Sequence, residues 1–275
     1  MDGRGLAERI RGQVAEEVEE LGSATLTTIL VGDDPASEIY IRRKQEAATE
    51  VGISARDYRL AQETSERELL EPIGELNAED AVDGILVQLP LPSQIDEHRA
   101  IEAVDPAKDV DGFHPINAGR LFLGHEGSVA ATPSGIMTLL AEYDVTLNGA
   151  RAVVVGRSNI VGKPVSLLLL AEHATVTICH SRTVDLAAHT READVLVVAV
   201  GQAGLVTPEM VKEGATVVDV GMNRTDDGLA GDVDFDAVKA VAGAITPVPG
   251  GVGPMTIAFL LRNTVQAARM QRAAD

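Results

Sequence analysis

Residues 40–44 read YIRRK, which puts a tyrosine and a lysine four positions apart. On a helix, residues four apart are neighbours on one face, so Tyr40 and Lys44 are predicted to lie side by side. A lysine whose surroundings lower its pKa can transfer protons near neutral pH, as a general acid or base does. An ordinary Tyr–Lys pair on a helix surface explains the same spacing, and spacing alone favours that simpler interpretation.

A polar amide, Gln88, ends the apolar run in DGILVQLPLP. The run before it is typical of a buried parallel strand, and the prolines after it prevent regular continuation. Ligands of open α/β sheets bind outside the carboxyl ends of the strands, where Gln88 is predicted to lie. Gln88 is therefore a candidate ligand-binding residue.

Two acids, Asp109 and Asp111, follow in the segment AKDVDG. A carboxylate can make paired hydrogen bonds to an N–H/NH₂ edge of the kind that guanidine-like heterocycles present. For Asp109 we favour a turn or capping role. For Asp111 ligand binding and a turn role remain open.

In the second half of the chain, VVVGRSNIVGKPVSLLLL (residues 153–170) predicts a strand that leads through a short polar turn into a helix. Amides at a helix N-terminus face an anion such as a pyrophosphate. The pattern G-x-G-x-x-G is not met, because Arg157 and Ser158 follow Gly156 and the next glycine is Gly162. We favour nucleotide binding here over a purely structural turn.

The next predicted strand ends in His180, Ser181 and Arg182, where NAD-binding folds usually carry an acid for the ribose 2′-hydroxyl. Arg157, Arg182 and Ser181 could accept a 2′-phosphate, which favours NADP over NAD. For Arg182 a solvated surface charge is an equal alternative. We expect His180 and Cys179 to finish the strand as packed or hydrogen-bonded residues and not as metal ligands, since no second histidine lies at ligand spacing.

Short apolar runs alternate with longer amphipathic stretches, which predicts βαβ units and parallel sheets covered by helices. The predicted strands are residues 25–32, 53–60, 83–90, 151–156, 174–180, 194–201, 215–221 and 243–246. Residues 104–132 show neither period and are predicted to be irregular. Helices are predicted to begin at Thr132-Pro133 and Thr207-Pro208, and a last helix over about residues 252–272 is expected to pack back on the first half.

The composition limits the kinds of partner. The chain has 42 acidic and 23 basic residues, a net charge of −19, which opposes binding to nucleic acids or anionic membranes. There is no signal-type apolar run and no stretch of about 20 apolar residues, so we expect a cytoplasmic protein. A single cysteine excludes an intramolecular disulfide. The acid excess with only five lysines is similar to proteins from salt-loving sources.

Ten segments along nearly the whole chain resemble the bifunctional 5,10-methylenetetrahydrofolate dehydrogenase / 5,10-methenyltetrahydrofolate cyclohydrolase family. They are, in order, VGDDPASEIYIRRK, DGILVQLPLP, PAKDVDGFHPINAGRL, ATPSGI, VVVGRSNIVGKP, ATVTICHSRT, ADVLVVAVG, VVDVGMNR, GDVDF and PVPGGVGPMT. The resemblance implies two α/β domains: a folate-binding catalytic domain of residues 1–130 and 250–275 with a parallel sheet, and a Rossmann-type NADP-binding domain of residues 131–249. The C-terminal helix would return to the first domain, and the chain would form a homodimer through the cofactor domain.

The implied function is oxidation of 5,10-methylenetetrahydrofolate with NADP and hydrolysis of the 5,10-methenyl product to 10-formyltetrahydrofolate, in one-carbon metabolism. By position, Lys44 looks like the catalytic lysine and Tyr40 like the aromatic residue beside the folate. Gln88 would hydrogen-bond near the lysine, and Asp111 would hold the pterin edge. The other implied substrate-binding residues are Val87, Leu89, Pro249, Gly250, Gly251, Val252 and Gly253; the implied cofactor-binding residues are Gly156, Arg157, Ser158, Ser181 and Met222.

One departure from the family pattern is visible. Ala130 and Ala131 stand where the family commonly has Pro-Cys, so a role for that cysteine is in doubt here. Three other functions compete: a dehydrogenase without cyclohydrolase activity, a shikimate-type or amino-acid dehydrogenase, and a non-catalytic nucleotide-sensing module. The motifs of the first half argue against all three.

Overall fold

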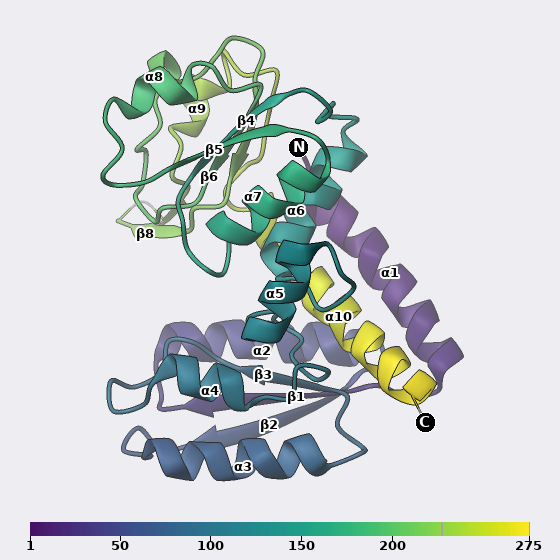
Figure 1. Ribbon diagram of the computed structural model, residues 1–275. Helices are drawn as coiled ribbons and strands as arrows, with labels where there is room; N and C mark the ends of the chain where they lie inside the picture. Colours follow the sequence, from purple (N-terminus) through teal and green to yellow (C-terminus); the bar gives the residue numbers. More distant parts are fainter. Residues whose placement is uncertain (227, 275) are drawn as a thin grey trace. The chain divides into compact units, whose positions relative to one another are not determined.

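The computed structural model describes residues 1–226 and 228–274 (Figure 1). The chain divides into two compact units. The first unit comprises residues 9–131 and the C-terminal residues from 257 onward; the second comprises residues 1–8 and 132–256. Each unit contains one parallel sheet, as predicted, and the second also has a short two-stranded hairpin.

The sheet of the first unit has the strand order β2-β1-β3, with all strands parallel. Every residue of the central strand β1 is buried, whereas the edge strand β2 is largely exposed. Ile29 of β1 and Ile85 of β3 belong to a core that includes Leu69, Ile73 and Leu76 of helix α3. The elements of this unit are α1 (Gly3–Leu21, which begins in the second unit), β1 (Thr25–Val31), α2 (Pro35–Glu50), β2 (Ser54–Leu60), α3 (Glu66–Ala78), β3 (Gly84–Val87), α4 (Glu97–Ala103) and α5 (Pro115–Leu123).

The C-terminal helix α10 (Val252–Ala274) packs along α1. Arg269 of α10 forms an ion pair with Glu17 of α1 at 2.9 Å, and the Arg272 guanidinium donates a hydrogen bond of 3.1 Å to the carbonyl oxygen of Leu21, the last residue of α1. The predicted return of the last helix to the first half is therefore confirmed.

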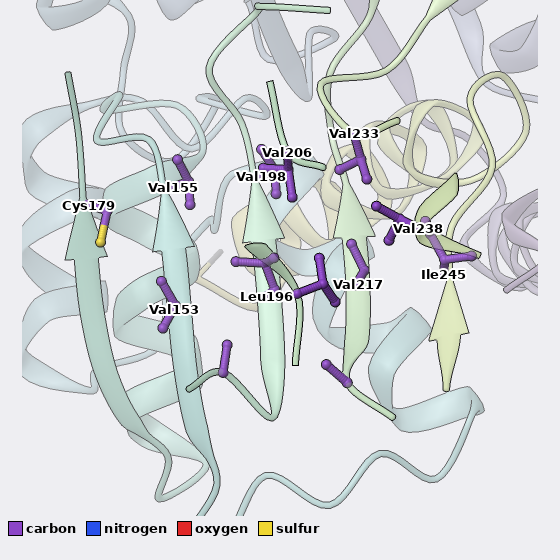
Figure 2. Close-up of a cluster of buried hydrophobic side chains, with 13 residues drawn as sticks. Val153, Val155, Cys179, Leu196, Val198, Val206, Val217, Val233, Val238 and Ile245 are labelled. Atoms are coloured by element: carbon purple, nitrogen blue, oxygen red, sulfur yellow. The ribbon is translucent and has the colours of Figure 1, made fainter. Parts of the chain in front are cut away.

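The sheet of the second unit has the parallel strand order β10-β7-β6-β4-β5. Figure 2 shows its core, in which side chains from neighbouring strands meet on one face of the sheet, for example Val155, Val198 and Val217. The elements are α6 (Ala131–Glu142), β4 (Arg151–Val155), α7 (Gly162–Ala171), β5 (Thr175–Cys179), α8 (Leu186–Thr190), β6 (Val195–Val198), the 3₁₀ turn η1 (Pro208–Met210), β7 (Thr216–Asp219), the hairpin strands β8 (Asn223–Thr225) and β9 (Gly228–Ala230), α9 (Phe235–Val238) and β10 (Ala244–Ile245).

Strand order locates the ligand-binding edge of this unit. Starting from β4, the chain adds β5 on one side and then β6 on the other, so the order reverses between β4 and β6. In open α/β sheets ligands bind outside the carboxyl ends of the strands at such a switch point. The segments that follow Val155 and Val198 therefore border the expected site.

The passage over residues 104–132 is not irregular as predicted, because it contains helix α5. His114 caps this helix, since its Nδ1 accepts a hydrogen bond from the Ile116 amide, and Pro115 occupies the first turn. The apolar residues Phe122 and Leu123 are exposed, and Asn117 is the helix residue that is buried. At nine residues the helix is also shorter than the window of about 11 to 18 residues over which helical periodicity is recognised.

The two predicted Thr-Pro helix starts also differ from expectation. Helix α6 begins one residue earlier, at Ala131, and the hydroxyl of Thr132 is hydrogen-bonded to that of Thr256 at 2.9 Å. Thr207 precedes only the short 3₁₀ turn η1 and makes no side-chain cap, because its hydroxyl bonds to the Glu209 carboxylate. Among the described residues, no helix combines the length and apolar character that crossing a bilayer requires.

Candidate active site

Lys44 lies on helix α2 of the first unit, and its Nζ donates a hydrogen bond of 3.1 Å to Gln88 Oε1. Gln88 follows β3, and its backbone amide continues the ladder to the Ile29 carbonyl oxygen at 2.9 Å. The Gln88 Nε2 donates to the Leu89 carbonyl oxygen at 2.6 Å. The amide nitrogen is thus held by the backbone, and its oxygen is turned toward the amine of Lys44.

Burial moves the pKa values of Lys44 and Asp111 toward neutrality. Burial lowers the pKa of Lys44, and the Asp111 charge opposes that shift. Burial raises the pKa of Asp111 from 3.8 to about 6, with the Lys44 charge opposing the shift and the Asp109 charge adding to it. The site therefore contains an amine and a carboxyl group that can both exchange protons closer to neutral pH than free side chains do.

Tyr40 lies one helical turn before Lys44 on α2, and 37% of its surface is exposed. This exposed area makes the side chain accessible for contact with a ligand.

Asp109 shapes the turn that presents Asp111. Its Oδ1 accepts hydrogen bonds from the Gly112 and Phe113 amides at 2.9 and 3.3 Å, and its Oδ2 accepts from His114 N and Asn117 Nδ2, both at 2.9 Å. The predicted turn and capping role of Asp109 is confirmed.

Gly112 has φ +71°, and a Cβ there would lie 2.5 Å from the Ala130 amide nitrogen, so this turn requires glycine.

A buried lysine, Lys108, escaped the sequence analysis. Only 6% of its surface is exposed, and Nζ donates to the carbonyl oxygens of Leu76 and Glu79 at 3.2 and 2.8 Å. These carbonyls lie at the C-terminal end of α3, and each also accepts from one backbone amide, Leu76 from Glu79 at 3.3 Å and Glu79 from Val82 at 3.0 Å. Lys108 therefore caps α3, while its backbone oxygen accepts from the Ile85 amide of β3 at 2.8 Å.

In the second unit, the turn after β4 requires glycine at two positions. Gly156 has φ +127°, and a Cβ there would lie 2.2 Å from the Ala199 carbonyl oxygen. A Cβ on Gly162 would lie 2.3 Å from the Gly156 carbonyl oxygen. The backbone therefore passes closely between strand and helix, as it does in dinucleotide-binding turns.

The amides at the start of α7 were predicted to face an anion, but in the structure they are hydrogen-bonded within the turn. Ser158 Oγ accepts hydrogen bonds from the Val161 and Gly162 amides at 3.1 and 3.3 Å, and the Ser158 carbonyl accepts from the Lys163 amide at 3.0 Å. The serine thus satisfies the helix N-terminus itself. Because both acceptor positions of its hydroxyl are used, the hydroxyl hydrogen is left to donate to a ligand.

The turn after β5 lies beside the Gly156 turn, since the Gly156 amide donates to the Cys179 carbonyl oxygen at 2.9 Å. Within this turn, the His180 amide donates to Thr183 Oγ1 at 2.8 Å, and the Arg182 amide donates to His180 Nδ1 at 3.1 Å. Cys179 is buried in the core, so the predicted packed or hydrogen-bonded roles of Cys179 and His180 are confirmed.

The remaining candidates of the second unit are accessible. The side chains of Arg157, Ser181 and Arg182 are exposed, and 42% of the surface of Met222 is exposed. In the loop Pro249–Gly253, the Gly250 carbonyl oxygen accepts hydrogen bonds from the Gly3 and Arg4 amides, each at 3.1 Å.

Fold and sites together define an α/β enzyme with a dinucleotide-binding unit and a separate site around a partly buried lysine. The family described as "Tetrahydrofolate dehydrogenase/cyclohydrolase, catalytic domain" matches residues 1–111, and "Tetrahydrofolate dehydrogenase/cyclohydrolase, NAD(P)-binding domain" matches residues 130–272. The bifunctional protein FolD of Desulfovibrio desulfuricans is 56% identical over 282 aligned positions, which cover 99% of each chain.

Solved structures show the same likeness. The bifunctional FolD methylenetetrahydrofolate dehydrogenase/cyclohydrolase from Campylobacter jejuni is 48% identical, with a TM-score of 0.97 over 98% of each chain. The Trypanosoma brucei methylenetetrahydrofolate dehydrogenase-cyclohydrolase, solved with NADP and an inhibitor, is 40% identical, with a TM-score of 0.94 over 100% of this chain and 97% of that one.

This protein belongs to the tetrahydrofolate dehydrogenase/cyclohydrolase family. It is a bifunctional enzyme of one-carbon metabolism.

Proposed function

We propose that the chain oxidises 5,10-methylenetetrahydrofolate with NADP and hydrolyses the resulting 5,10-methenyl compound to 10-formyltetrahydrofolate, with Lys44 transferring protons in the hydrolysis. The observation that carries this proposal is the partly buried amine of Lys44, held at 3.1 Å by the neutral amide of Gln88. An unperturbed lysine, with a pKa near 10.4, is a poor base at neutral pH. Burial lowers the pKa of Lys44 and so increases the neutral fraction.

In the hydrolysis, water adds to the cationic methenyl carbon and one carbon–nitrogen bond of the bridge breaks. The neutral amine of Lys44 takes a proton from the attacking water and returns one to the nitrogen that leaves, and the remaining hydroxyl proton is released to solvent as the formyl C=O forms. The positive charge of the substrate bridge lowers the pKa of the amine further. Gln88 orients the amine without placing a negative charge beside it, which would stabilise the ammonium form.

The folate itself would be held by groups around this amine. Asp111 would accept paired hydrogen bonds from the pterin edge, and the exposed ring of Tyr40 would lie against the substrate. Val87 and Leu89, which flank Gln88, and Pro249, Gly250, Gly251, Val252 and Gly253 would complete the contacts. In this proposal, residues 1–130 and 250–275 form the folate domain and residues 131–249 the NADP domain.

The second unit fits a dinucleotide. The glycines of the turn after β4 permit close backbone approach, and Ser158 offers a hydroxyl hydrogen. Arg157 and Ser181 would hold the 2′-phosphate, and Gly156 and Met222 would contact the rest of the cofactor. When bound, NADP supplies the hydride acceptor. The relative from T. brucei was solved with NADP.

Replacing Lys44 with methionine tests the catalytic assignment. The change preserves most of the side-chain volume but removes the amine. Hydrolysis of methenyltetrahydrofolate, followed by absorbance, is expected to disappear while NADP affinity stays near normal. Unchanged hydrolysis would reject Lys44 as the proton-transfer group.

Replacing Arg157 with alanine tests the cofactor assignment. Loss of a charge-assisted phosphate contact should raise KM for NADP about tenfold or more and leave KM for NAD nearly unchanged. Arg151 is the control, because it is an exposed arginine paired with Glu192 at the start of β4, and its replacement by alanine should alter neither value. An equal effect of the Arg157 change on both cofactors would assign Arg157 to the pyrophosphate or to the fold.

Two further proposals concern the setting of the enzyme. The net charge of −19 with five lysines supports an origin in a salt-rich cytoplasm, where salt screens the carboxylates. Retention of full activity after dialysis into dilute buffer would contradict that origin. The family resemblance supports a homodimer formed through the NADP domain, and a monomeric mass by sedimentation at micromolar concentration would contradict it.

A further inference from the structure

Two buried carboxylates of the second unit have no part in the chemistry described above. Asp219 ends β7 and Asp232 follows β9, and their exposed fractions are 1% and 0%. We call these two residues the carboxylate clamp. Burying two acids is costly unless their oxygens receive hydrogen bonds, so the donors show what the clamp holds.

The carboxylate of Asp232 accepts hydrogen bonds from one loop and from one side chain. Its Oδ2 accepts hydrogen bonds from the Val200 and Gly201 amides at 2.7 and 3.0 Å. Its Oδ1 accepts from the Gln202 amide and from Asn223 Nδ2, both at 2.8 Å. Three consecutive backbone amides of the loop 200–202 therefore depend on one carboxylate.

This loop lies at the switch point of the sheet. It follows β6, and the residue before it, Ala199, donates its amide to the Val155 carbonyl oxygen of β4 at 2.8 Å. The Ala199 carbonyl is also the group that excludes any side chain at Gly156. The loop is thus adjacent to the turn where the dinucleotide is proposed to bind.

The carboxylate of Asp219 accepts hydrogen bonds from backbone amides at and next to Asp232 and before Met222. Its Oδ1 accepts from the Gly221 and Asp232 amides, both at 2.9 Å, and its Oδ2 accepts from the Val233 amide at 3.0 Å. Asp219 thereby fixes both the backbone of Asp232 and the segment that leads to Met222.

The two halves of the clamp interlock. A Cβ on Gly221 would lie 2.4 Å from Asp232 Cγ, and one on Gly231 would lie 1.8 Å from Asp219 Oδ2. Each carboxylate therefore packs against a glycine of the segment that carries the other. The segments held in this way present two partly exposed apolar side chains, Val200 at 38% and Met222 at 42%.

We propose that Asp232, held in place by Asp219, is a positioning residue for the cofactor, because it fixes the loop 200–202 and the Met222 segment as walls of the dinucleotide site. Asp232 touches neither cofactor nor substrate in this role. The inference rests on the proposed NADP-dependent function.

The test compares Asp232→Asn with wild-type enzyme. The amide has the same shape, but its NH₂ group cannot accept hydrogen bonds from the loop amides, so the loop should shift. KM for NADP should rise about tenfold or more, as expected for loss of charge-assisted hydrogen bonds. Hydrolysis of methenyltetrahydrofolate, measured without cofactor, should stay within about twofold of wild type, since Lys44 and Gln88 lie in the other unit.

Asp234→Asn is the matched control. Asp234 lies two residues away and caps α9 by accepting a hydrogen bond from the Ala237 amide at 3.3 Å, so the same loss of charge should change neither activity. Asn223→Ala is a milder probe, because it removes one donor to Asp232 and leaves the three loop amides in place. It should raise KM for NADP about threefold.

The outcomes separate the two proposals. If wild-type enzyme oxidises methylenetetrahydrofolate with NADP but Asp232→Asn keeps the wild-type KM, the positioning role is wrong and the proposed function stands. If Asp232→Asn loses both activities together and Asn223→Ala leaves KM unchanged, the clamp serves only folding. If wild-type enzyme shows no NADP-dependent oxidation, the proposed function itself fails.

Discussion

Replacing Gln88 with glutamate would place a carboxylate where the amide oxygen now lies, 3.1 Å from Lys44 Nζ. An opposite charge at this range raises a lysine pKa by about one to three units. The Coulomb energy of a pair at about 4 Å, about 4 kcal/mol at an effective dielectric constant of 20, corresponds to the upper end of that range. The shift would act against the burial that lowers the pKa of Lys44.

Each rise of one unit in the pKa of Lys44 lowers the neutral fraction of the amine about tenfold at a fixed pH below the pKa. Cyclohydrolase kcat for Gln88→Glu at pH 7 should therefore fall about 10- to 1000-fold. The loss should be recovered as the pH rises, so the rate profile moves to higher pH by the same one to three units. The dehydrogenase step needs no proton transfer and should be less affected.

The assay is the loss of methenyltetrahydrofolate absorbance as a function of pH, with the uncatalysed rate subtracted. Gln88→Met is the matched control, because it removes the hydrogen bond without adding a charge. It should lower the rate and leave the midpoint of the profile where it is or move it to lower pH. Identical midpoints for Gln88→Glu and Gln88→Met would refute the claim that the charge state of Lys44 limits hydrolysis.

Two further predictions concern stability. Burial raises the pKa of Asp111 from 3.8 to about 6, so the folded state binds the carboxyl proton more tightly than the unfolded state does. Protonation therefore stabilises the fold. This stabilisation is complete below about pH 4 and is lost as the pH rises through 6. Asp111→Asn should therefore increase the free energy of unfolding in urea by up to about 3 kcal/mol at pH 7.5 and by much less at pH 5, and a uniform change at both pH values would contradict this cause. Lys108→Met removes the ammonium donor from the Leu76 and Glu79 carbonyl oxygens, each of which keeps one backbone donor, and should cost about 1.5 to 3 kcal/mol. The same change at Lys212, in an exposed pair with Asp194, should cost less than about 1 kcal/mol, and equal costs would show that Lys108 is not a cap.

The sequence was sufficient for the strands of the two parallel sheets, most of which are continuous apolar runs. Val153, Leu196 and Val217 all lie in such runs and meet in the core of the second unit (Figure 2). The hairpin strands β8 and β9 were not predicted, because each has only three residues and neither is buried. Helix α5 was missed because its nine residues are fewer than the window of about 11 to 18 residues over which helical periodicity is recognised.

Buried polar groups limited how much of the site could be predicted from the sequence. Lys44 could be singled out by its spacing of four residues from Tyr40, and Gln88 because it ends an apolar strand. Asp219 and Asp232 could not, because two acids in a chain with 42 acidic residues give no sign of which are buried. The double acceptor role of Ser158 depends on the path of the turn and not on residue type, so a helix N-terminus open to an anion was predicted in error.

The proton-transfer role of Lys44 can be tested directly by NMR titration of the lysine side chains. The chain has only five lysines, so labelled lysine gives few signals, and Lys44→Arg assigns the one of interest. Burial should lower the pKa of Lys44 below the ordinary value near 10.4, as it should for Lys108. A Lys44 signal that titrates at the ordinary value in the folded enzyme would contradict the proposal that this amine is the base.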